Sequence, residues 1–287
     1  MEWKKHHKTI RLHEQNISYI DSEQGDETLL ILHGFATSSY DYHKIVDELK
    51  KSYRVIIPDL IGFGYSSKPK HYFYTAKDQA SLLTVFLREL KIENLSIMAQ
   101  GFGVCILDEI ESILDLGFVD IAIKNVFFLN SRIQMALTKD DKDLENQRKK
   151  ITSSLLKLSL SYEMFQKYMK VSFYKKEAVS EEELQNHWQL LTYNNGIKTM
   201  NYIDNYVLET TKFGKRRLRN LKKSTFNKFV IWGKNDENDS VETFEKIKDL
   251  LELNPKNMAL IEDCGHFPML EKPEEFVKIV KGFKESA

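Results

Sequence analysis

The sequence predicts an α/β fold with a mostly parallel central sheet, flanked by helices and interrupted by a long helical insertion. Apolar runs of strand length alternate with helical patterns in the first part of the chain, and the alternation resumes after about residue 221. This rhythm is typical of βαβ units, which build a parallel sheet with right-handed connections. Between them the pattern is helical and polar. We expect a core formed by residues 1–130 and 221–287, and a helical cap formed by 131–220.

The individual elements follow from apolar periodicity and from turn residues. Continuous apolar runs such as Thr28–Leu32 are expected for strands that are buried on both faces of a parallel sheet. The predicted strands are 10–13 and 17–20, which form a hairpin, then 28–32, 53–57, 96–99, 123–129, 226–232 and 258–261. The predicted helices are 41–51, 76–90, 104–110, 143–157, 162–171, 181–192, 197–211, 241–251 and 273–283.

The central stretch Ser96–Val104 has the layout of a nucleophile elbow. An apolar run enters a turn of small residues, and a helical pattern leaves it. The usual elbow reads G-x-S-x-G, with the central residue exposed at the top of the sheet on a strained turn. Here the same five positions read Ala-Gln-Gly-Phe-Gly, from Ala99 to Gly103. Gly101 therefore occupies the nucleophile position without a side chain.

Other residues at predicted strand ends complete a catalytic arrangement. Phe35, in the loop that begins with His33 and Gly34, and Phe102, after the nucleophile position, would supply backbone N–H groups for an oxyanion hole. Later strands lead to Asp236 and His266, the acid and the base. The histidine activates a nucleophile or a water, and the carboxylate fixes its tautomer. The order of nucleophile, acid and base is that of α/β-hydrolases.

Each of these residues also has a simpler interpretation. Asp236 could be a turn residue, with Asp239 as an alternative acid, and a single loop histidine is more often structural than catalytic. Cys105 and Cys264 could replace the missing nucleophile only if they were accessible, and we expect both to be buried. The coincidence of all the features, in order and at strand ends, favours the catalytic interpretation.

Together these segments resemble the α/β-hydrolase superfamily over nearly the whole chain. The resemblance rests on 32–35, 58–66, the elbow, 232–236 and 265–273. The elbow is similar to that of haloalkane dehalogenases and epoxide hydrolases, which have an aspartate nucleophile followed by an aromatic residue and glycine. The cap segments around Trp188, Tyr193–Asn195 and Tyr202 are similar to those of the mesoderm-specific transcript family.

This resemblance implies a hydrolase whose substrate is a small apolar or amphipathic organic molecule between core and cap. Phe35 and Phe102 lack the polar groups that hold halide in dehalogenases, so dehalogenation is disfavoured. Epoxide hydrolases polarise the ring oxygen with cap tyrosines, for which Tyr193, Tyr202 and Tyr206 are candidates, although packing or surface positions are favoured for each. His33, Gly34 and Gln100 are the other pocket candidates. No cofactor and no metal are expected.

Three explanations of Gly101 remain open. An Asp or Ser was deliberately replaced, or the chain is a natural pseudo-hydrolase that binds a ligand or serves as a scaffold, or the His266–Asp236 dyad acts alone as the base of an oxygenase or lyase. Glycine suits a strained turn at no steric cost. We expect hydrolysis to be weak or absent, so the enzyme assignment stays open.

Composition restricts the partners and the location. Lys and Arg total 42, as do Asp and Glu, so no overall field favours nucleic acid. The charged start, the lack of a long apolar run and only two cysteines predict no signal peptide, no transmembrane segment and a cytoplasmic location. The basic segment Lys212–Lys223 is expected to be a solvated helix end, with an anionic partner or membrane surface as the alternative.

Overall fold

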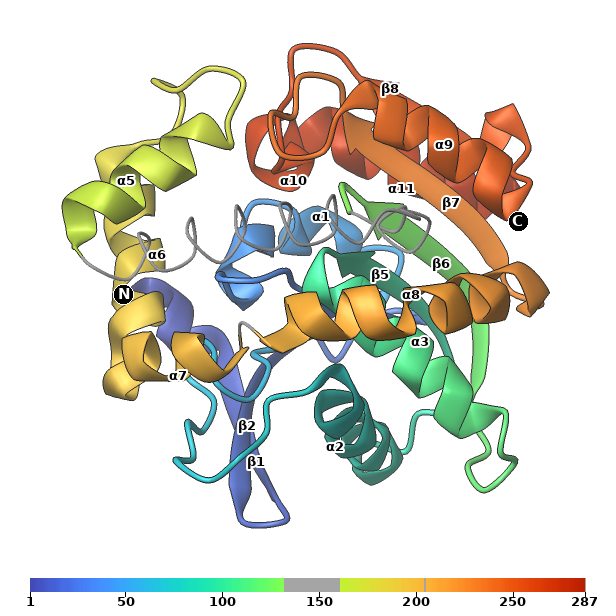
Figure 1. Ribbon diagram of the computed structural model, residues 1–287, viewed down its shortest axis with the longest axis horizontal. Helices are drawn as coiled ribbons and strands as arrows, with labels where there is room; N and C mark the ends of the chain where they lie inside the picture. The colour runs from blue at the N-terminus through green and yellow to red at the C-terminus, as the bar shows by residue number, and fades with distance from the viewer. Residues whose placement is uncertain (132–160, 204, 287) are drawn as a thin grey trace.

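A computed structural model of the protein describes residues 1–131, 161–203 and 205–286 (Figure 1). Its sheet has eight strands in the order β1-β2-β4-β3-β5-β6-β7-β8. The pairs β1–β2 and β2–β4 are antiparallel, and all other pairs are parallel. This confirms the predicted α/β class. The strands are β1 His7–Leu12, β2 Gln15–Asp21, β3 Thr28–Leu32, β4 Arg54–Pro58, β5 Asn94–Gln100, β6 Ala122–Leu129, β7 Asn227–Gly233 and β8 Met258–Ile261.

Helices cover both faces of this sheet. On one face α2, α3, α8 and α9 contact each other in turn, and on the other α11 packs on β7 and β8. The α-helices are α1 Val46–Leu49, α2 Ala76–Glu89, α3 Phe102–Leu114, α5 Tyr162–Val171, α6 Glu181–Thr192, α7 Gly196–Ile203, α8 Asn205–Lys223, α9 Val241–Leu251, α10 Pro268–Glu271 and α11 Pro273–Ser286. Short 3₁₀ helices are η1 Glu2–His6, η2 Ser39–Tyr42, η4 Tyr193–Asn195 and η5 Pro255–Asn257.

The long amphipathic elements match their predicted positions, and two helices differ. The predicted helix 41–51 is instead two short pieces, η2 and α1. The Ser38 hydroxyl accepts a hydrogen bond from the Tyr40 N–H, so a local turn competes with a continuous helix there. The predicted helix 197–211 is assigned to two helices, α7 and α8. The predicted helix 143–157 lies outside the described residues.

The basic segment lies on α8, and part of it is not solvated. Arg216 and Arg217 both bond to Glu109 of α3, and Arg217 is buried. The other basic side chains of the segment are exposed, namely Lys212, Lys215, Arg219, Lys222 and Lys223. Because α8 ends at Lys223, the predicted cap boundary at residue 220 falls inside a helix that packs on the core. Among the described helices, none is both long enough and apolar enough to cross a membrane.

The parallel strands end at a common edge. Leu32 of β3 lies opposite Ala99 of β5, and Gln100 lies opposite Leu129 of β6. The loops that follow these strands therefore begin side by side. In Figure 1, α5, α6 and α7 gather at one side of the sheet, away from the layer of α2 and α3.

Candidate active site

The link between β5 and α3 is a strained turn. β5 ends at Gln100, α3 begins at Phe102, and Gly101 between them has φ 52° and ψ −113°. Residues with a side chain rarely adopt such a positive φ, and they do so mainly at functional sites. The backbone geometry is therefore that of a nucleophile elbow.

The two glycines of this turn, Gly101 and Gly103, differ in the room that each leaves for a Cβ atom. The sequence alone does not reveal this difference. A Cβ built on Gly101 would meet only the Cα of Gly34, at 3.7 Å, which is an ordinary contact. A Cβ on Gly103 would lie 2.4 Å from the Leu32 carbonyl oxygen. Gly103 is thus required for α3 to approach β3, whereas position 101 has room for a side chain that it lacks.

The predicted acid and base lie in direct contact. His266 Nδ1 is 2.7 Å from Asp236 Oδ2. Asn130 Nδ2 donates to the same oxygen at 2.7 Å, and the Asn238 N–H donates to Asp236 Oδ1 at 2.7 Å. Asp239 Oδ2 is 3.9 Å from His266 Nδ1, so of the two candidate acids Asp236 is the one that hydrogen-bonds the imidazole through this nitrogen.

The surroundings of Asp236 keep its carboxylate ionised. Burial raises the pKa of this carboxyl group, but the charge of His266 and hydrogen bonds from His266, Asn238 and Asn130 outweigh burial, and the net pKa is lowered. An ionised carboxylate fixes the imidazole tautomer and stabilises an imidazolium. The pair is therefore suited to general base chemistry.

Three segments that are distant in sequence hold the histidine loop. Gln100 Nε2 donates to the His266 carbonyl oxygen at 2.7 Å, and the His266 N–H donates to the Ser172 carbonyl oxygen at 2.7 Å. Glu271 Oε1 accepts from the Gly265 N–H at 2.9 Å. The structure thus places Gln100 beside the base, where it orients the loop.

The loop after β3 is fixed by His33. Its Nδ1 lies 2.8 Å from the Gly34 carbonyl oxygen, and its Nε2 accepts from the Leu60 N–H at 3.1 Å. These bonds assign the proton to Nδ1, and burial lowers the pKa of the imidazole. His33 is fully buried, and these two hydrogen bonds join the backbone of the Gly34 loop to that of the turn after β4.

The two predicted oxyanion residues have apolar surroundings. The Phe35 ring packs edge-on against Phe63, with centroids 5.9 Å apart, and Phe102 is fully buried. Phe102 is also the first residue of α3, where the positive end of the helix dipole favours negative charge. Their role in an oxyanion hole stays a prediction.

The tyrosine candidates contact other parts of the core. Tyr193 is 38% exposed and packs edge-on against Tyr65, and Tyr202 is 52% exposed and stacks on Tyr74. These contacts fit the packing and surface positions that the sequence favours for them. The Tyr206 side chain lies outside the described residues.

Neither cysteine is an accessible nucleophile. Cys105 and Cys264 are both buried. Burial raises the pKa of the Cys264 thiol well above its usual range, which disfavours the reactive thiolate. Cys105 lies within α3, one turn beyond the elbow.

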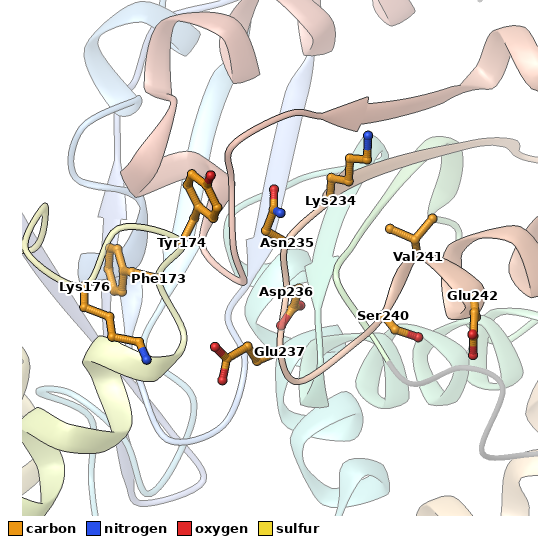
Figure 2. Close-up of a pocket in the computed structure, with 10 residues that line it drawn as sticks. All are labelled: Phe173, Tyr174, Lys176, Lys234, Asn235, Asp236, Glu237, Ser240, Val241 and Glu242. Atoms are coloured by element: carbon orange, nitrogen blue, oxygen red, sulfur yellow. The ribbon is translucent and has the colours of Figure 1, made fainter.

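A hollow of about 710 Å³ opens beside Asp236. Figure 2 shows its two walls, the segment that carries Phe173, Tyr174 and Lys176 and the loop from β7 to α9. Lysine and glutamate side chains both line it, so it carries no single sign of charge. The Asp236 side chain itself is fully buried, so the hollow lies against the loop that carries the predicted acid.

One cluster of side chains in the described part of the chain has the composition of a metal site. Ligand atoms of Asp236, Asp239 and His266 lie within 4.8 Å of one another. The 2.7 Å between His266 Nδ1 and Asp236 Oδ2 is, however, the length of a hydrogen bond. The Nδ1–H that donates this bond to the carboxylate has no lone pair for a metal ion, so the cluster is better suited to hold a proton.

Comparison with known proteins agrees with this geometry. Residues 27–106, which include the loop after β3 and the elbow, match the family described as alpha/beta hydrolase fold. The protein has the α/β-hydrolase fold. Over 273 residues it is 27% identical to the mesoderm-specific transcript homolog protein of Homo sapiens, covering 91% of this chain and 79% of that protein.

The chain is also similar to other proteins. Lipase 3 of Moraxella sp. is 26% identical over 275 residues, covering 90% of this chain and 78% of the lipase. The solved structure of the epoxide hydrolase CorEH superposes with a TM-score of 0.70 at 17% identity, covering 98% of each chain. The resemblance expected from the sequence is thereby confirmed at the level of the fold and of these relatives.

Several residues that contact this candidate site were not predicted from the sequence. Asn130 directly follows β6, so its position after a buried strand was a usable signal. Ser172 and Glu271 act through contacts to the histidine loop, and their spacing to His266 in the sequence carries no signal. Asn130 Oδ1 also accepts from the Gly233 N–H at 3.1 Å, which links the ends of β6 and β7.

Proposed function

We propose that this α/β-hydrolase-fold protein has a hydrolase site that is complete except for the nucleophile at position 101, and that its hydrolytic activity is therefore weak or absent. The observation that carries the proposal is the empty space at Gly101 on a turn with elbow geometry, next to an assembled His266–Asp236 pair. The ligand would be a small apolar or amphipathic organic molecule between the core and the predicted cap.

The chemistry of the dyad limits what the printed sequence can do. A hydrolase of the aspartate branch first forms an ester between its nucleophile and the substrate, and a histidine-activated water then hydrolyses that ester. Without a side chain at 101, His266 could only activate water for direct attack. That route lacks the covalent step and much of its rate, so binding without turnover is the expected behaviour.

Restoring the nucleophile tests this proposal. The native chain, Gly101→Asp and Gly101→Ser are assayed on epoxide, ester and haloalkane panels, with Gly101→Ala as the matched control for backbone strain. We expect Gly101→Asp to raise turnover of an epoxide or another aspartate-branch substrate by at least about 100-fold, since losing one member of a catalytic unit costs more than that. Gly101→Ala should stay inactive.

The same series decides between the alternatives. If all four proteins are inert on every panel, the proposed hydrolase site is wrong and the scaffold interpretation is favoured. If the native chain already turns over a substrate and loses that activity on His266→Ala, the dyad acts alone as a base. A ligand-binding protein would keep its ligand affinity in that variant.

A further inference from the structure

Helix α6 is held on the core by polar side chains. Asn186 Nδ2 donates to the Tyr40 hydroxyl at 2.8 Å, and Lys44 Nζ lies 2.6 Å from Glu183 Oε1. A third pair joins α6 to the core, Asp41 of η2 and His187 of α6, in which Asp41 Oδ1 lies 3.7 Å from His187 Nδ1.

The Asp41–His187 pair is buried and not hydrogen-bonded. Asp41 is fully buried and His187 is 3% exposed. Asp41 Oδ2 accepts from the Thr37 hydroxyl at 2.5 Å, but Asp41 Oδ1 and both ring nitrogens of His187 have no hydrogen-bond partner. Unbonded polar atoms are costly in a protein interior and call for an explanation. Closure by about 1 Å would bring the two groups to hydrogen-bond distance.

Burial acts on the two groups in opposite directions. It raises the pKa of the Asp41 carboxyl to about 7, an effect that the Thr37 hydrogen bond and the charge of His266 oppose and that Asp59 adds to. It also lowers the pKa of His187 to about 3, with the charges of His43 and Lys44 acting in the same direction. With α6 docked, Asp41 therefore keeps a proton and His187 is neutral at mildly acidic pH.

In solvent the same proton would reside on the other group. An exposed Asp has a pKa of about 3.9 and an exposed His about 6.5. Between these values the separated groups are a carboxylate and an imidazolium. Docking of α6 thus needs no net uptake or release of a proton, because the proton that leaves His187 is the one that Asp41 requires.

We propose that Asp41 and His187 form a proton-transfer latch, in which His187 passes its proton to Asp41 as α6 docks and the resulting neutral pair fastens α6 to the core over a range of pH. In the transfer the His187 N–H bond breaks and an O–H bond forms at Asp41. The O–H of Asp41 then donates to His187 Nδ1. No other reactant is needed.

The latch also reaches the loop of the candidate active site. Thr37 is bonded to Asp41 and lies two residues after Phe35. The docked pair therefore fixes the loop that carries the predicted oxyanion N–H. The proposal concerns docking, and it holds whether or not Gly101 supports turnover.

Other charged groups face this contact. They are His43, Lys44, Glu183, Asp59 and His266. An experiment must therefore use substitutions to distinguish the effect of Asp41 and His187 from the effects of these neighbours.

Hydrogen exchange of α6 amides, corrected for intrinsic exchange rates, measures its opening at pH 5 and pH 7. The proteins compared are the full native chain, Asp41→Asn, His187→Gln and the double variant. In the native chain we expect the opening equilibrium of α6 to change by less than about 3-fold between pH 5 and pH 7. The raised pKa of Asp41 and the lowered pKa of His187 have opposite effects on the pH dependence of opening.

The single variants should have opposite pH dependence. In Asp41→Asn only the histidine is left, whose docked pKa is lowered, so opening should fall by at least about 10-fold from pH 5 to pH 7. In His187→Gln only the carboxyl is left, whose docked pKa is raised, so opening should rise by at least about 10-fold over the same interval. The double variant should be nearly independent of pH.

Glu183→Gln is the matched control, because it removes the neighbouring ion pair on the same helix face. It should loosen α6 by a similar factor at both pH values. The proposal fails if both single variants keep the native pH dependence, or if their slopes have the same sign. NMR of ¹⁵N-labelled histidine gives a second readout that does not require the substitutions to fold well, and a native His187 that is protonated at pH 5 overturns the proposal.

Discussion

Arg217 of α8 donates a hydrogen bond to Glu109 Oε1 of α3 across 3.2 Å, and both side chains are buried. Arg216 bonds to the same carboxylate oxygen. Asp108 adds a second carboxylate, whose Oδ2 is 3.8 Å from Arg217 Nε. This ionic cluster joins the helix that follows the elbow to the last helix before β7.

Two buried carboxyl groups of α3, Asp108 and Glu111, predict that stability decreases as pH rises. Burial raises the pKa of Asp108 to about 7 and that of Glu111 to about 8. A raised pKa in the fold stabilises it below the unfolded value, and this stabilisation is lost as pH rises through the folded value. Urea unfolding should therefore show a free energy of unfolding that falls between pH 5 and pH 8. Asp108→Asn should make the decrease between pH 5 and pH 7 shallower, since only the contribution of Glu111 then remains, and an unchanged slope would contradict the assignment.

The two elbow glycines should differ in their response to alanine. Gly103→Ala places a Cβ 2.4 Å from the Leu32 carbonyl oxygen, so α3 must move and the loss should reach about 3 kcal/mol or more. Gly101→Ala meets only an ordinary contact, and its positive φ should cost about 1–2 kcal/mol. Thermal and urea unfolding of both variants measure the difference, and equal losses would argue against open space at 101.

Asn130 is expected to be a positioning residue for the acid. Its side chain bonds both Asp236 and the Gly233 N–H. Asn130→Ala leaves two buried groups short of a partner, which should cost about 1–3 kcal/mol of stability. Asn257→Ala, which removes a single 3.3 Å bond to the Lys228 carbonyl oxygen, is the control and should cost less. In the Gly101→Asp background Asn130→Ala should also lower turnover, and a variant that lost only stability would show that Asn130 has no part in the site.

Glu271 should hold the histidine loop. Its carboxylate accepts from the backbone N–H groups of Gly265 and Tyr174. Glu271→Gln keeps the shape but places an amide NH₂ where one acceptor was needed, so local exchange in 264–267 should rise while α2, on the far side of the sheet, stays protected. Hydrogen exchange by mass spectrometry tests this, and unchanged protection of the loop would contradict the role of Glu271.

Local sequence patterns predicted most of the fold. Helices α5 and α6 have the bounds that periodicity predicts, because Ser161 and Ser180 cap them through side-chain hydrogen bonds. The elbow could be predicted because its signal is also local. An apolar run, a turn of small residues and a helical pattern follow one another directly in the sequence. The acid and the base could be predicted because each follows a predicted strand.

Contacts between segments that are distant in sequence could not be predicted from the sequence. The pairing of Asn130 with Asp236 depends on the register of β6 and β7, which no short stretch of sequence encodes. The position of Tyr193 depends on a turn in which Asn194 and Asn195 adopt positive φ. Asp41 looked like one polar residue in a helical stretch, and only the docking of α6 makes it a buried partner of His187.

The bond from the His266 N–H to the Ser172 carbonyl oxygen has a consequence for protein engineering and for evolutionary divergence. Ser172 belongs to the predicted cap, yet its carbonyl oxygen accepts a hydrogen bond from the backbone of the loop that carries the predicted base. Its hydroxyl also accepts from Asn238 Nδ2 at 3.2 Å, beside the acid. A chimera that exchanges the whole predicted cap with a relative would therefore also replace contacts that support the His266–Asp236 pair. Exchanges that retain residues 172–174 of the host should preserve the geometry of the dyad.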